Sequence, residues 1–390
     1  MHNMKSKKNN PKANSNQTLS RLWLGIGWFL AFFLTTLLVF VATLYCLMWM
    51  FCKGPSESAR DTFVATMLET GNMKFVVSWY LSEEEILAIT SRKASVTADT
   101  ATQTDPSLVS VNAVSSNEGT TTLTLVNTEE SSNGITLVPI TGRTFEAQLL
   151  IIEDPSRIEL ATIYPWSSMD REKNGMTVGE YCDTYGAIAA VNAGEFETPS
   201  GINWGGCPIG VVVCDGEVQF NEPSAGDVMV GFNVNHILII QEIGAMTPAE
   251  FETYVTDNAI MDAVSFKDLS DGNTNHFTRL IMNGTPVELN GKGVGANPRT
   301  AIGQCADGTV LILVTDGRGT AGHLGATGDD LINIMTEYGA VNAANLDGGS
   351  SSSLYYQGSY QITSSFLPNS DASRRLPTAF VIMDSTGGAQ

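Results

Sequence analysis

Residues 327–350 read TGDDLINIMTEYGAVNAANLDGGS, a pattern that combines a helix, a strand and a polar loop. Thr327, with Asp330 three residues later, is typical of a capping box, and apolar residues at helical spacing follow as far as Tyr338. Gly339 lies where a helix end favours a left-handed residue. The small and apolar residues that come next predict a buried strand, which runs into the polar loop.

A second segment, residues 178–196, has the same order of features. We expect a helix at Val178–Thr184, a glycine stop at Gly186, a buried strand that ends at Asn192, and a polar loop. A true internal duplication would place the two loops at comparable positions. Chance similarity over a dozen residues is the alternative.

From Phe145 onward, apolar runs alternate with Gly, Asn and Asp, which is typical of mixed strands and helices. The predicted fold class is α+β: a mixed β-sheet domain with flanking helices over residues 143–386. Residues 245–275 form a polar excursion with a short helix from Thr247 to Val255. We interpret this excursion as an insertion that serves as a lid or as a partner surface.

The segment Leu22–Cys52 contains no charged residue and is long enough to cross a bilayer. It is too long for the core of a cleaved signal peptide, so residues 22–52 are predicted to be a transmembrane signal anchor. Basic residues concentrate before it, and the positive-inside rule then places residues 1–21 in the cytoplasm as a short tail. We therefore expect a single-pass protein of the cell membrane with an extracytoplasmic C-terminal domain.

Two connecting regions follow the span. Residues 53–94 are predicted to form a helical stalk, in which Ser82 and Glu85 make a capping box. Residues 95–142 are rich in Ser and Thr and are predicted to be a linker.

Charge and cysteine content exclude several classes of function. The formal charge is −20, and residues 61–390 hold 14 basic and 40 acidic side chains (14 − 40 = −26). Such a surface repels phosphate backbones, so nucleic acid is not an expected partner. Four of the 6 cysteines lie beyond the span, where up to two disulfides in three alternative pairings are possible. The cysteines and histidines lack the spacing of a zinc site.

Charged residues follow apolar runs at several predicted strand ends, where rigid scaffolds commonly hold catalytic groups. Asp316 and Asp347 each precede glycine without a simple return strand, which favours a functional site over a hairpin turn. For the nearby arginines the alternative is a surface ion pair. His276 and His323 can act as acids, but a surface histidine is the default interpretation.

Five segments taken together resemble the motif series of the phosphodiester glycosidase family. They are Ile152–Ser156, Ala190–Phe196, Pro298–Gly303, Val314–Arg318 and Asn345–Ser350. The resemblance covers roughly residues 145–384. It implies an α+β fold and an extracytoplasmic enzyme that hydrolyses a sugar-1-phosphodiester, since members include an enzyme that removes N-acetylglucosamine from a mannose 6-phosphate diester.

The chain departs from the family pattern at one motif. The usual Asn-Gly-Gly-Phe-Phe reads Asn192-Ala193-Gly194-Glu195-Phe196 here, so that Ala193 replaces a glycine and Glu195 replaces an aromatic residue. The second change is expected to reshape the pocket.

Cleavage of a glycosyl phosphate needs a carboxylate that acts on water or on the anomeric carbon, and cationic groups that neutralise the departing phosphate. The candidate catalytic residues are Asp316, Asp347 and Glu195. The candidate substrate-binding residues are Asn192, Arg299, Arg318, Asn345, Gly348, Gly349, Ser350 and Arg375. Asn192 and Asn345 are expected either to hold sugar hydroxyls or to orient an Asp. Gly348 and Gly349 are expected to offer backbone N–H groups to an anion.

The expected partners are a glycosyl phosphodiester or polysaccharide of the cell envelope or of an exopolysaccharide, and the lipid bilayer. A cofactor is not required by the sequence, although clustered Asp and Asn oxygens are suitable ligands for Ca²⁺. The alternative function is a catalytically silent carbohydrate-binding or polysaccharide-assembly module on the same fold. Glu195 in place of the aromatic residue is the feature that favours this alternative.

Overall fold

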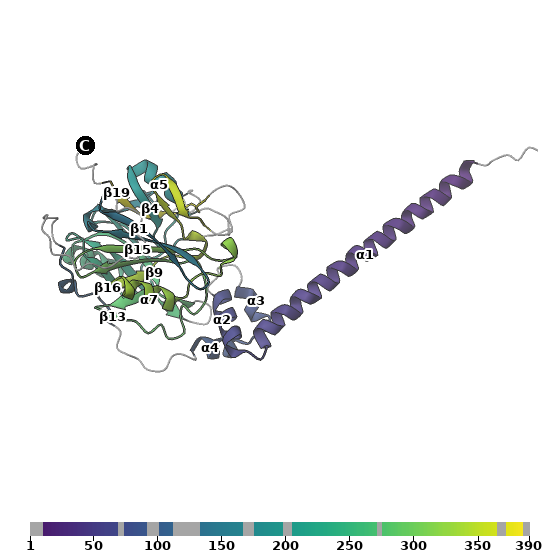
Figure 1. Ribbon diagram of the computed structural model, residues 1–390, viewed down its shortest axis with the longest axis horizontal. Coiled ribbons are helices and arrows are strands. Elements are labelled where there is room, and N and C mark those ends of the chain that lie inside the picture. Colours follow the sequence, from purple (N-terminus) through teal and green to yellow (C-terminus); the bar gives the residue numbers. More distant parts are fainter. Residues whose placement is uncertain are drawn as a thin grey trace, which may run out of the picture. The chain divides into compact units, whose positions relative to one another are not determined.

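The structure is a computed structural model that describes residues 11–68, 74–91, 101–111, 133–166, 175–197, 205–270, 275–364 and 372–384. The chain divides into two compact units, Met1–Arg60 and Asp61–Gln390, which are described separately. The ribbon in Figure 1 shows a long helix and a domain rich in strands.

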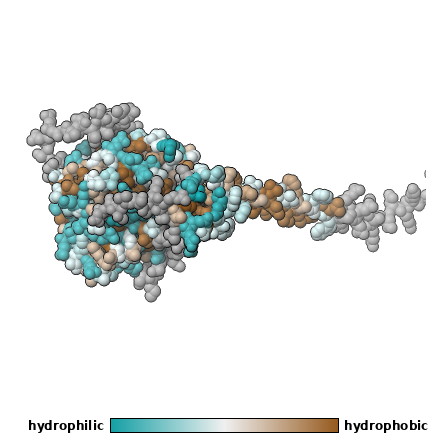
Figure 2. Space-filling view, turned by 90° about the horizontal axis from the view of Figure 1, so that it is seen from below, coloured by the Kyte–Doolittle hydropathy of each residue, from teal (hydrophilic) through white to brown (hydrophobic). Residues whose placement is uncertain are grey.

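The first unit contains helix α1, Pro11–Lys53. Its segment Trp23–Lys53 is long and apolar enough to cross a membrane, and large apolar side chains are exposed along it. Figure 2 shows these hydrophobic residues on the side of the helix that faces the viewer. The predicted span therefore coincides with one continuous helix.

Three short helices follow α1 in the chain: α2 (Glu57–Leu68), α3 (Lys74–Ser78) and α4 (Glu83–Ser91). The expected capping box precedes α4, because Ser82 N–H donates to Glu85 Oε2 at 2.9 Å and Glu85 N–H donates to Ser82 Oγ at 3.2 Å. Short helices are thus present in the region predicted to be a stalk.

The domain is built on three antiparallel sheets, in the strand orders below. Sheet I contains β1 (Ile135–Thr141), β2 (Glu146–Ile152), β15 (Val310–Thr315), β14 (Thr300–Cys305), β16 (Ala340–Asn345), β12 (Arg279–Met282) and β13 (Thr285–Pro286). Sheet II contains β18 (Ser359–Ile362), β17 (Leu354–Tyr356), β4 (Ala187–Asn192), β19 (Thr378–Met383) and β3 (Ile158–Thr162). Sheet III contains β6 (Glu217–Asn221), β5 (Val211–Cys214), β9 (Ile260–Lys267), β7 (Asp227–Asn233) and β8 (Leu238–Glu242). A small ladder joins β10 (Leu269–Ser270) to β11 (Asn275–His276).

A central core draws apolar side chains from all three sheets. The outer face of each sheet is covered by one helix, and each helix forms its own apolar cluster with that sheet: α5 (Val178–Tyr185) with sheet II, α6 (Pro248–Asp257) with sheet III and α7 (Gly328–Glu337) with sheet I. Figure 1 shows α5 and α7 on opposite sides of the domain. The predicted α+β class with flanking helices is confirmed, and the ladders between these named strands are antiparallel.

Helices α5, α6 and α7 each begin with a threonine capping box and lead into an interior strand of a sheet, β4, β9 and β16 respectively. The boxes are Thr177 with Glu180, Thr247 with Glu250, and Thr327 with Asp330. The two predicted helix-strand units are therefore joined by a third, α6–β9, in which β9 lies between β5 and β7. Because β9 is a buried central strand, residues 260–267 are part of the scaffold and not of an inserted lid.

Two segments of the predicted linker belong to the domain. Strand β1 pairs with β2 along its whole length. Residues 101–111 lie along the edge strand β8, where Thr104 N–H donates to Ile240 O at 3.1 Å and Glu242 N–H donates to Thr102 O at 3.0 Å. Residues 92–100 and 112–132 of this region lie outside the described residues. The polar composition matched a linker, but backbone pairing with a sheet edge does not require apolar side chains.

All 6 cysteines lie in the described part of the chain, and the structure joins none of them in a disulfide. None of the predicted disulfide pairings is present in the structure.

Candidate active site

The ends of the central strands of the three sheets meet at one place. Asp347 N–H, which follows β16, donates to Ala193 O, which follows β4, at 3.2 Å. Glu195 N–H donates to Ser265 O on β9 at 3.2 Å. The three helix-strand units therefore bring their polar ends together, as the comparison of the first two units predicted.

Asp347 is a partly buried carboxylate at this junction. Burial raises its pKa above the ordinary value, and four groups act in the opposite direction: a hydrogen bond from Ser351, the positive charges of Arg374 and Arg318, and the Gly348 N–H. The Gly348 N–H lies 2.9 Å from Asp347 Oδ1. The two guanidinium groups favour the ionised form of this carboxylate and supply positive charge near it that an anionic ligand can bind.

Arg318 and Arg374 approach Asp347 from different segments. Arg318 follows β15, and its Nε donates to Asn297 Oδ1 at 3.2 Å. Arg374 precedes β19, its Nη1 donates to Ser350 Oγ at 3.3 Å, and its guanidinium lies 4.9 Å from the centroid of the Phe196 ring. Burial lowers the pKa of Arg374 while Asp347 raises it. Both arginines remain cations, because an arginine is not deprotonated in a protein.

Gly349 is required for this approach. Its φ of 64° is left-handed, and a Cβ at this position would lie 2.7 Å from Nη2 of Arg318. A side chain here would therefore displace the guanidinium from Asp347.

Asp316 forms a pair with His323 within the loop that follows β15. Asp316 Oδ2 lies 2.6 Å from Nδ1 of His323, and Oδ1 accepts the Glu146 N–H at 2.8 Å. Because an ionised carboxylate only accepts hydrogen bonds, Nδ1 carries the proton of this contact, and Nε2 is the nitrogen that can accept another. Asp316 is thus a positioning residue that orients a histidine.

The loop that carries this pair also carries Arg318. Gly319 N–H donates to His323 O at 2.7 Å and Arg318 N–H donates to Leu324 O at 3.1 Å, which closes the loop as a hairpin. The charge of Arg318 and the imidazole of His323 therefore belong to one local structure that reaches the Asp347 loop.

Asn192 has a structural role beside Asp347 and does not lie at the surface. It is fully buried, its Nδ2 donates to Asp347 O at 2.5 Å, and its Oδ1 accepts Thr300 Oγ1 at 2.8 Å and Ser353 N–H at 3.2 Å. Asn345 is also buried, and its Nδ2 donates to Phe277 O at 2.9 Å. The side-chain amide of each asparagine donates to a backbone carbonyl, and Asn192 fixes the backbone of Asp347 itself.

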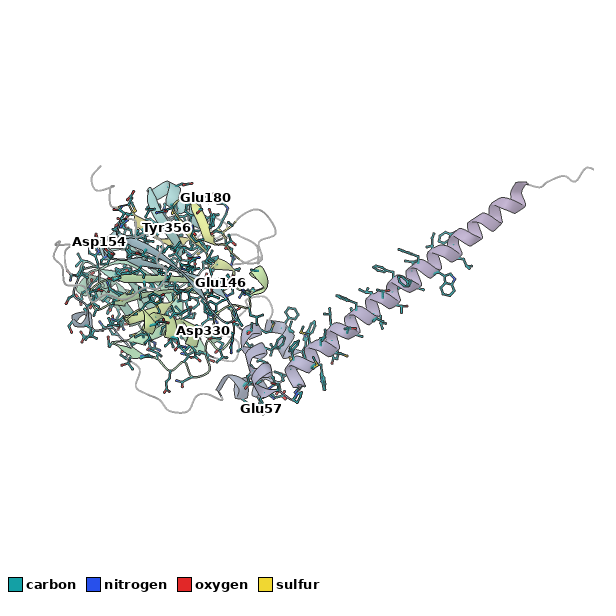
Figure 3. The ribbon with its side chains drawn as sticks, viewed as in Figure 1. Glu57, Glu146, Asp154, Glu180, Asp330 and Tyr356 are labelled. Atoms are coloured by element: carbon teal, nitrogen blue, oxygen red, sulfur yellow. The ribbon has the colours of Figure 1, made fainter. Side chains whose placement is uncertain are left out.

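Arg299 and Arg375, two of the predicted phosphate ligands, lie in other environments. Arg299 is 7% exposed, donates to Gly295 O at 2.9 Å and to Ala326 O at 3.3 Å, and lies over the ring of Phe277. Arg375 binds both carboxylate oxygens of Glu180, at 2.9 and 3.1 Å. In Figure 3, Glu180 lies apart from Glu146, whose backbone holds Asp316. The backbone of Arg299 lies beside the loop of Asp347, because its Cα is 3.7 Å from the place that a Cβ on Gly348 would take. A phosphate-binding role for these two arginines stays a prediction.

The two glycines do not present N–H groups to an anion in the way we expected. Gly348 N–H donates to Asp347 Oδ1, and Gly349 N–H donates to Pro298 O at 2.8 Å. Gly349 has a steric role, because its left-handed turn leaves room for Arg318, whereas a Cβ on Gly348 would lie 3.1 Å from Pro298 O. Ser350 does lie at the site, where its Oγ accepts a hydrogen bond from Arg374.

Glu195 lies beside the junction through its backbone, since its carbonyl accepts Ile209 N–H at 2.9 Å. The backbone of this residue links the end of β4 to sheet III. Within the described residues, groups of three or more His, Cys, Asp or Glu side chains with a geometry for a metal ion are absent, so the structure adds no support for Ca²⁺.

Sequence reasoning missed two members of the site, Arg374 and Ser351, and it named His323 as an acid only beside the default interpretation of a surface histidine. Arg374 and Arg375 are neighbours in the sequence, and their alternation along an extended segment would have placed only one of them toward the site. His323 lies seven residues after Asp316 in a glycine-rich loop, a spacing without a known pattern.

Comparisons with known proteins point to one family. A family model described as phosphodiester glycosidase matches residues 185–383. The SPbeta prophage-derived uncharacterized protein YomE of Bacillus subtilis strain 168 is 42% identical over 64 residues, which cover 16% of this chain and 10% of the relative. The match thus spans a tenth of that relative's length.

Solved structures with a similar fold have low sequence identity. The catalytic domain of zebrafish N-acetylglucosamine-1-phosphodiester alpha-N-acetylglucosaminidase, auto-inhibited by its pro-peptide, has a TM-score of 0.49 and 18% identity, over 66% of this chain and 87% of that chain. An exported protein of Burkholderia pseudomallei has a TM-score of 0.39 and 17% identity, over 61% of this chain and 74% of that chain.

Proposed function

Because the chain belongs to the phosphodiester glycosidase family, we propose that it is a membrane-anchored glycosidase that hydrolyses a sugar-1-phosphodiester. The substrate that we propose is similar to N-acetylglucosamine-1-phosphodiester, in an extracytoplasmic polymer of the cell envelope or an exopolysaccharide. The proposed orientation, with the N-terminus in the cytoplasm, rests on the basic residues that precede the apolar part of α1.

The observation that carries this proposal is that Arg318 and Arg374 both reach the loop of Asp347: a Cβ on Gly349 would lie 2.7 Å from Nη2 of Arg318, and Nη1 of Arg374 donates to Ser350 Oγ at 3.3 Å. A neutral glycoside has no charge for two guanidinium groups to bind, whereas a phosphodiester offers an anion directly beside the bond to be broken. The same two charges oppose the effect of burial on the pKa of Asp347, which favours its ionised form.

The proposed reaction breaks the bond between the anomeric carbon and the phosphate oxygen. Arg318 and Arg374 bind the phosphate and neutralise the charge that develops on it, so the phosphomonoester leaves without prior protonation. Asp347 stabilises the positive charge at the anomeric carbon. Water supplies the new oxygen, and its proton passes to Nε2 of His323, which Asp316 holds in the required tautomer.

The test is an assay of the full chain in detergent or nanodiscs, with an α-N-acetylglucosamine-1-phosphodiester beside an aryl α-N-acetylglucosaminide. We expect sugar release from the diester and little from the aryl glycoside, because only the diester presents an anion to Arg318 and Arg374. Equal rates on both would contradict the phosphodiester assignment. Saccharide binding without turnover of either compound would favour the catalytically silent module.

A further inference from the structure

Two aromatic side chains on and beside α3 are exposed together. Phe75 is 48% exposed and Trp79 is 70% exposed, and their rings meet edge to face with centroids 5.1 Å apart. They lie four residues apart, so they occupy one side of a helical turn. The other large apolar residues that are exposed in the described part of 101–390 are scattered in the sequence: Leu108, Tyr164, Val234 and Leu324.

The opposite side of this segment is buried. Val76 is 8% exposed, Val77 is 0% and Leu81 is 6%, so burial fixes which side faces outward. The aromatic pair is therefore presented on a packed element and does not belong to a frayed end.

The position of the pair in the chain indicates what it contacts. The apolar part of α1 ends at Lys53, and Phe75 follows 22 residues later (75 − 53 = 22). A connection of this length is compatible with contact between the pair and the surface of the bilayer that α1 would cross. Trp and Phe have apolar rings, and tryptophan is enriched at the level of the lipid headgroups.

We propose that Phe75 and Trp79 insert into the headgroup layer of the membrane that α1 spans, as a second attachment of the domain. The contact is apolar and not electrostatic, because Glu83 and Glu84, which open the next helix, are exposed and would be repelled by anionic lipids. It restrains the orientation of the extracytoplasmic domain relative to the lipid surface. This inference rests on the membrane anchoring in the proposed function, and not on the proposed catalysis.

The test uses the full chain in nanodiscs of phosphatidylcholine, with a nitroxide on the lipid headgroup as a fluorescence quencher. Trp79→Phe leaves an aromatic side chain at an exposed position, so folding is retained, and the difference in emission between wild type and this variant reports Trp79. We expect this difference to be quenched by the headgroup nitroxide and to be insensitive to added salt. A matched control places Leu108→Trp in the Trp79→Phe background, and its emission is expected to stay unquenched.

Three results would overturn the proposal. One is a Trp79 signal that is quenched no more than the Leu108→Trp control. Another is quenching that depends on protein concentration, which would assign the aromatic pair to a contact between two copies of the chain. The last is a wild-type protein in which the tryptophans of α1 are also unquenched, because α1 itself would then lie outside the bilayer. The activity assay is independent of all three, so failure here is distinguishable from failure of the proposed reaction.

Discussion

The units α5–β4 and α7–β16 share a scaffold but differ in the residues at the ends of their strands. Both begin with a threonine capping box and have a glycine with positive φ before the strand, 65° at Gly186 and 83° at Gly339. Asn192 ends the first strand and makes three internal hydrogen bonds. The second strand ends at Asn345, and two residues later comes Asp347, the carboxylate whose pKa the charges of Arg374 and Arg318 lower.

The difference shows how one structural unit supports two tasks. The β4 end contributes a side chain amide and a carbonyl that hold the β16 loop in place, and the β16 end contributes the charged group. A repeated scaffold thus supplies both the charged side chain and the structure that positions it.

The largest effect is expected when the charge of Asp347 is removed, because this charge distinguishes the β16 end from the β4 end. Asp347→Asn keeps an oxygen that can accept the Gly348 N–H, so the loop is retained. We expect kcat on the diester to fall about 10³-fold, because a charge that stabilises the transition state is lost. The measurement is steady-state sugar release with thermal unfolding as a control. Retention of more than a tenth of the activity would move the reaction away from the β16 end.

The Asp316–His323 pair tests the other part of the centre. His323→Gln is expected to lower kcat about 10²-fold, because the group that receives the proton of water is removed. Asp316→Asn should give a smaller loss, since the imidazole remains but is held less well. Imidazole added to a His323→Gly variant is expected to restore part of the rate, and failure of both the loss and the rescue would exclude a proton-transfer role.

The structural role of Asn192 is tested by the free energy of unfolding. Asn192→Ala removes three hydrogen bonds in a fully buried place and is expected to lower the free energy of unfolding by about 2–3 kcal/mol. Asn345→Ala is the matched variant at the equivalent position of the other unit, where the side-chain amide donates to Phe277 O. Chemical denaturation should show the larger loss of unfolding free energy for Asn192→Ala. A larger loss for Asn345→Ala would refute the assignment of the structural role to the β4 end.

The third unit offers the smallest effect, through Asp262 on β9. Burial raises the pKa of this carboxyl from 3.8 to about 6, with smaller contributions of the same sign from Asp215 and Glu159. The folded state therefore retains a proton that the unfolded state releases, so the contribution of this group to stability is fully present below pH 3.8 and is lost as the pH rises to about 6.

Asp262→Asn is accordingly expected to stabilise the domain by about 1–2 kcal/mol at pH 8 and to have little effect at a pH of about 3.5. The control for charge removal is Asp307→Asn, at an exposed position in the turn between β14 and β15. The measurement is the unfolding free energy of wild type and Asp262→Asn at the two pH values. A stabilisation that is equal at both would show that burial of the charge is not the cause.

Much of the scaffold was predictable from local patterns. Thr327 with Asp330 and the glycines at 186 and 339 act within one turn of the chain, so their effect can be read from neighbours in the sequence. Strand β1 and residues 101–111 could not be predicted in this way, because their partners β2 and β8 determine their structure.

The site was predictable only in part, for the same physical reason. Asp347 and Arg318 follow buried strands directly, and this position marked them. His323 reaches Asp316 through a hairpin whose closure depends on backbone geometry. Whether Arg374 or Arg375 faces Asp347 depends on the register of the extended segment that precedes β19, and Glu180 on α5 binds the other one.

These two neighbouring arginines give the most direct test of the central claim, that the centre of reaction is Asp347 with Arg318 and Arg374. The measurement is kcat/KM on the sugar-1-phosphodiester, across pH, for Arg374→Ala and Arg375→Ala. We expect a loss of about 10²-fold for Arg374→Ala. The acidic limb should also move to higher pH, since Arg374 lowers the pKa of Asp347. Arg375→Ala should stay close to wild type in both respects, and equal losses for the two variants, or a larger loss for Arg375→Ala, would contradict the account.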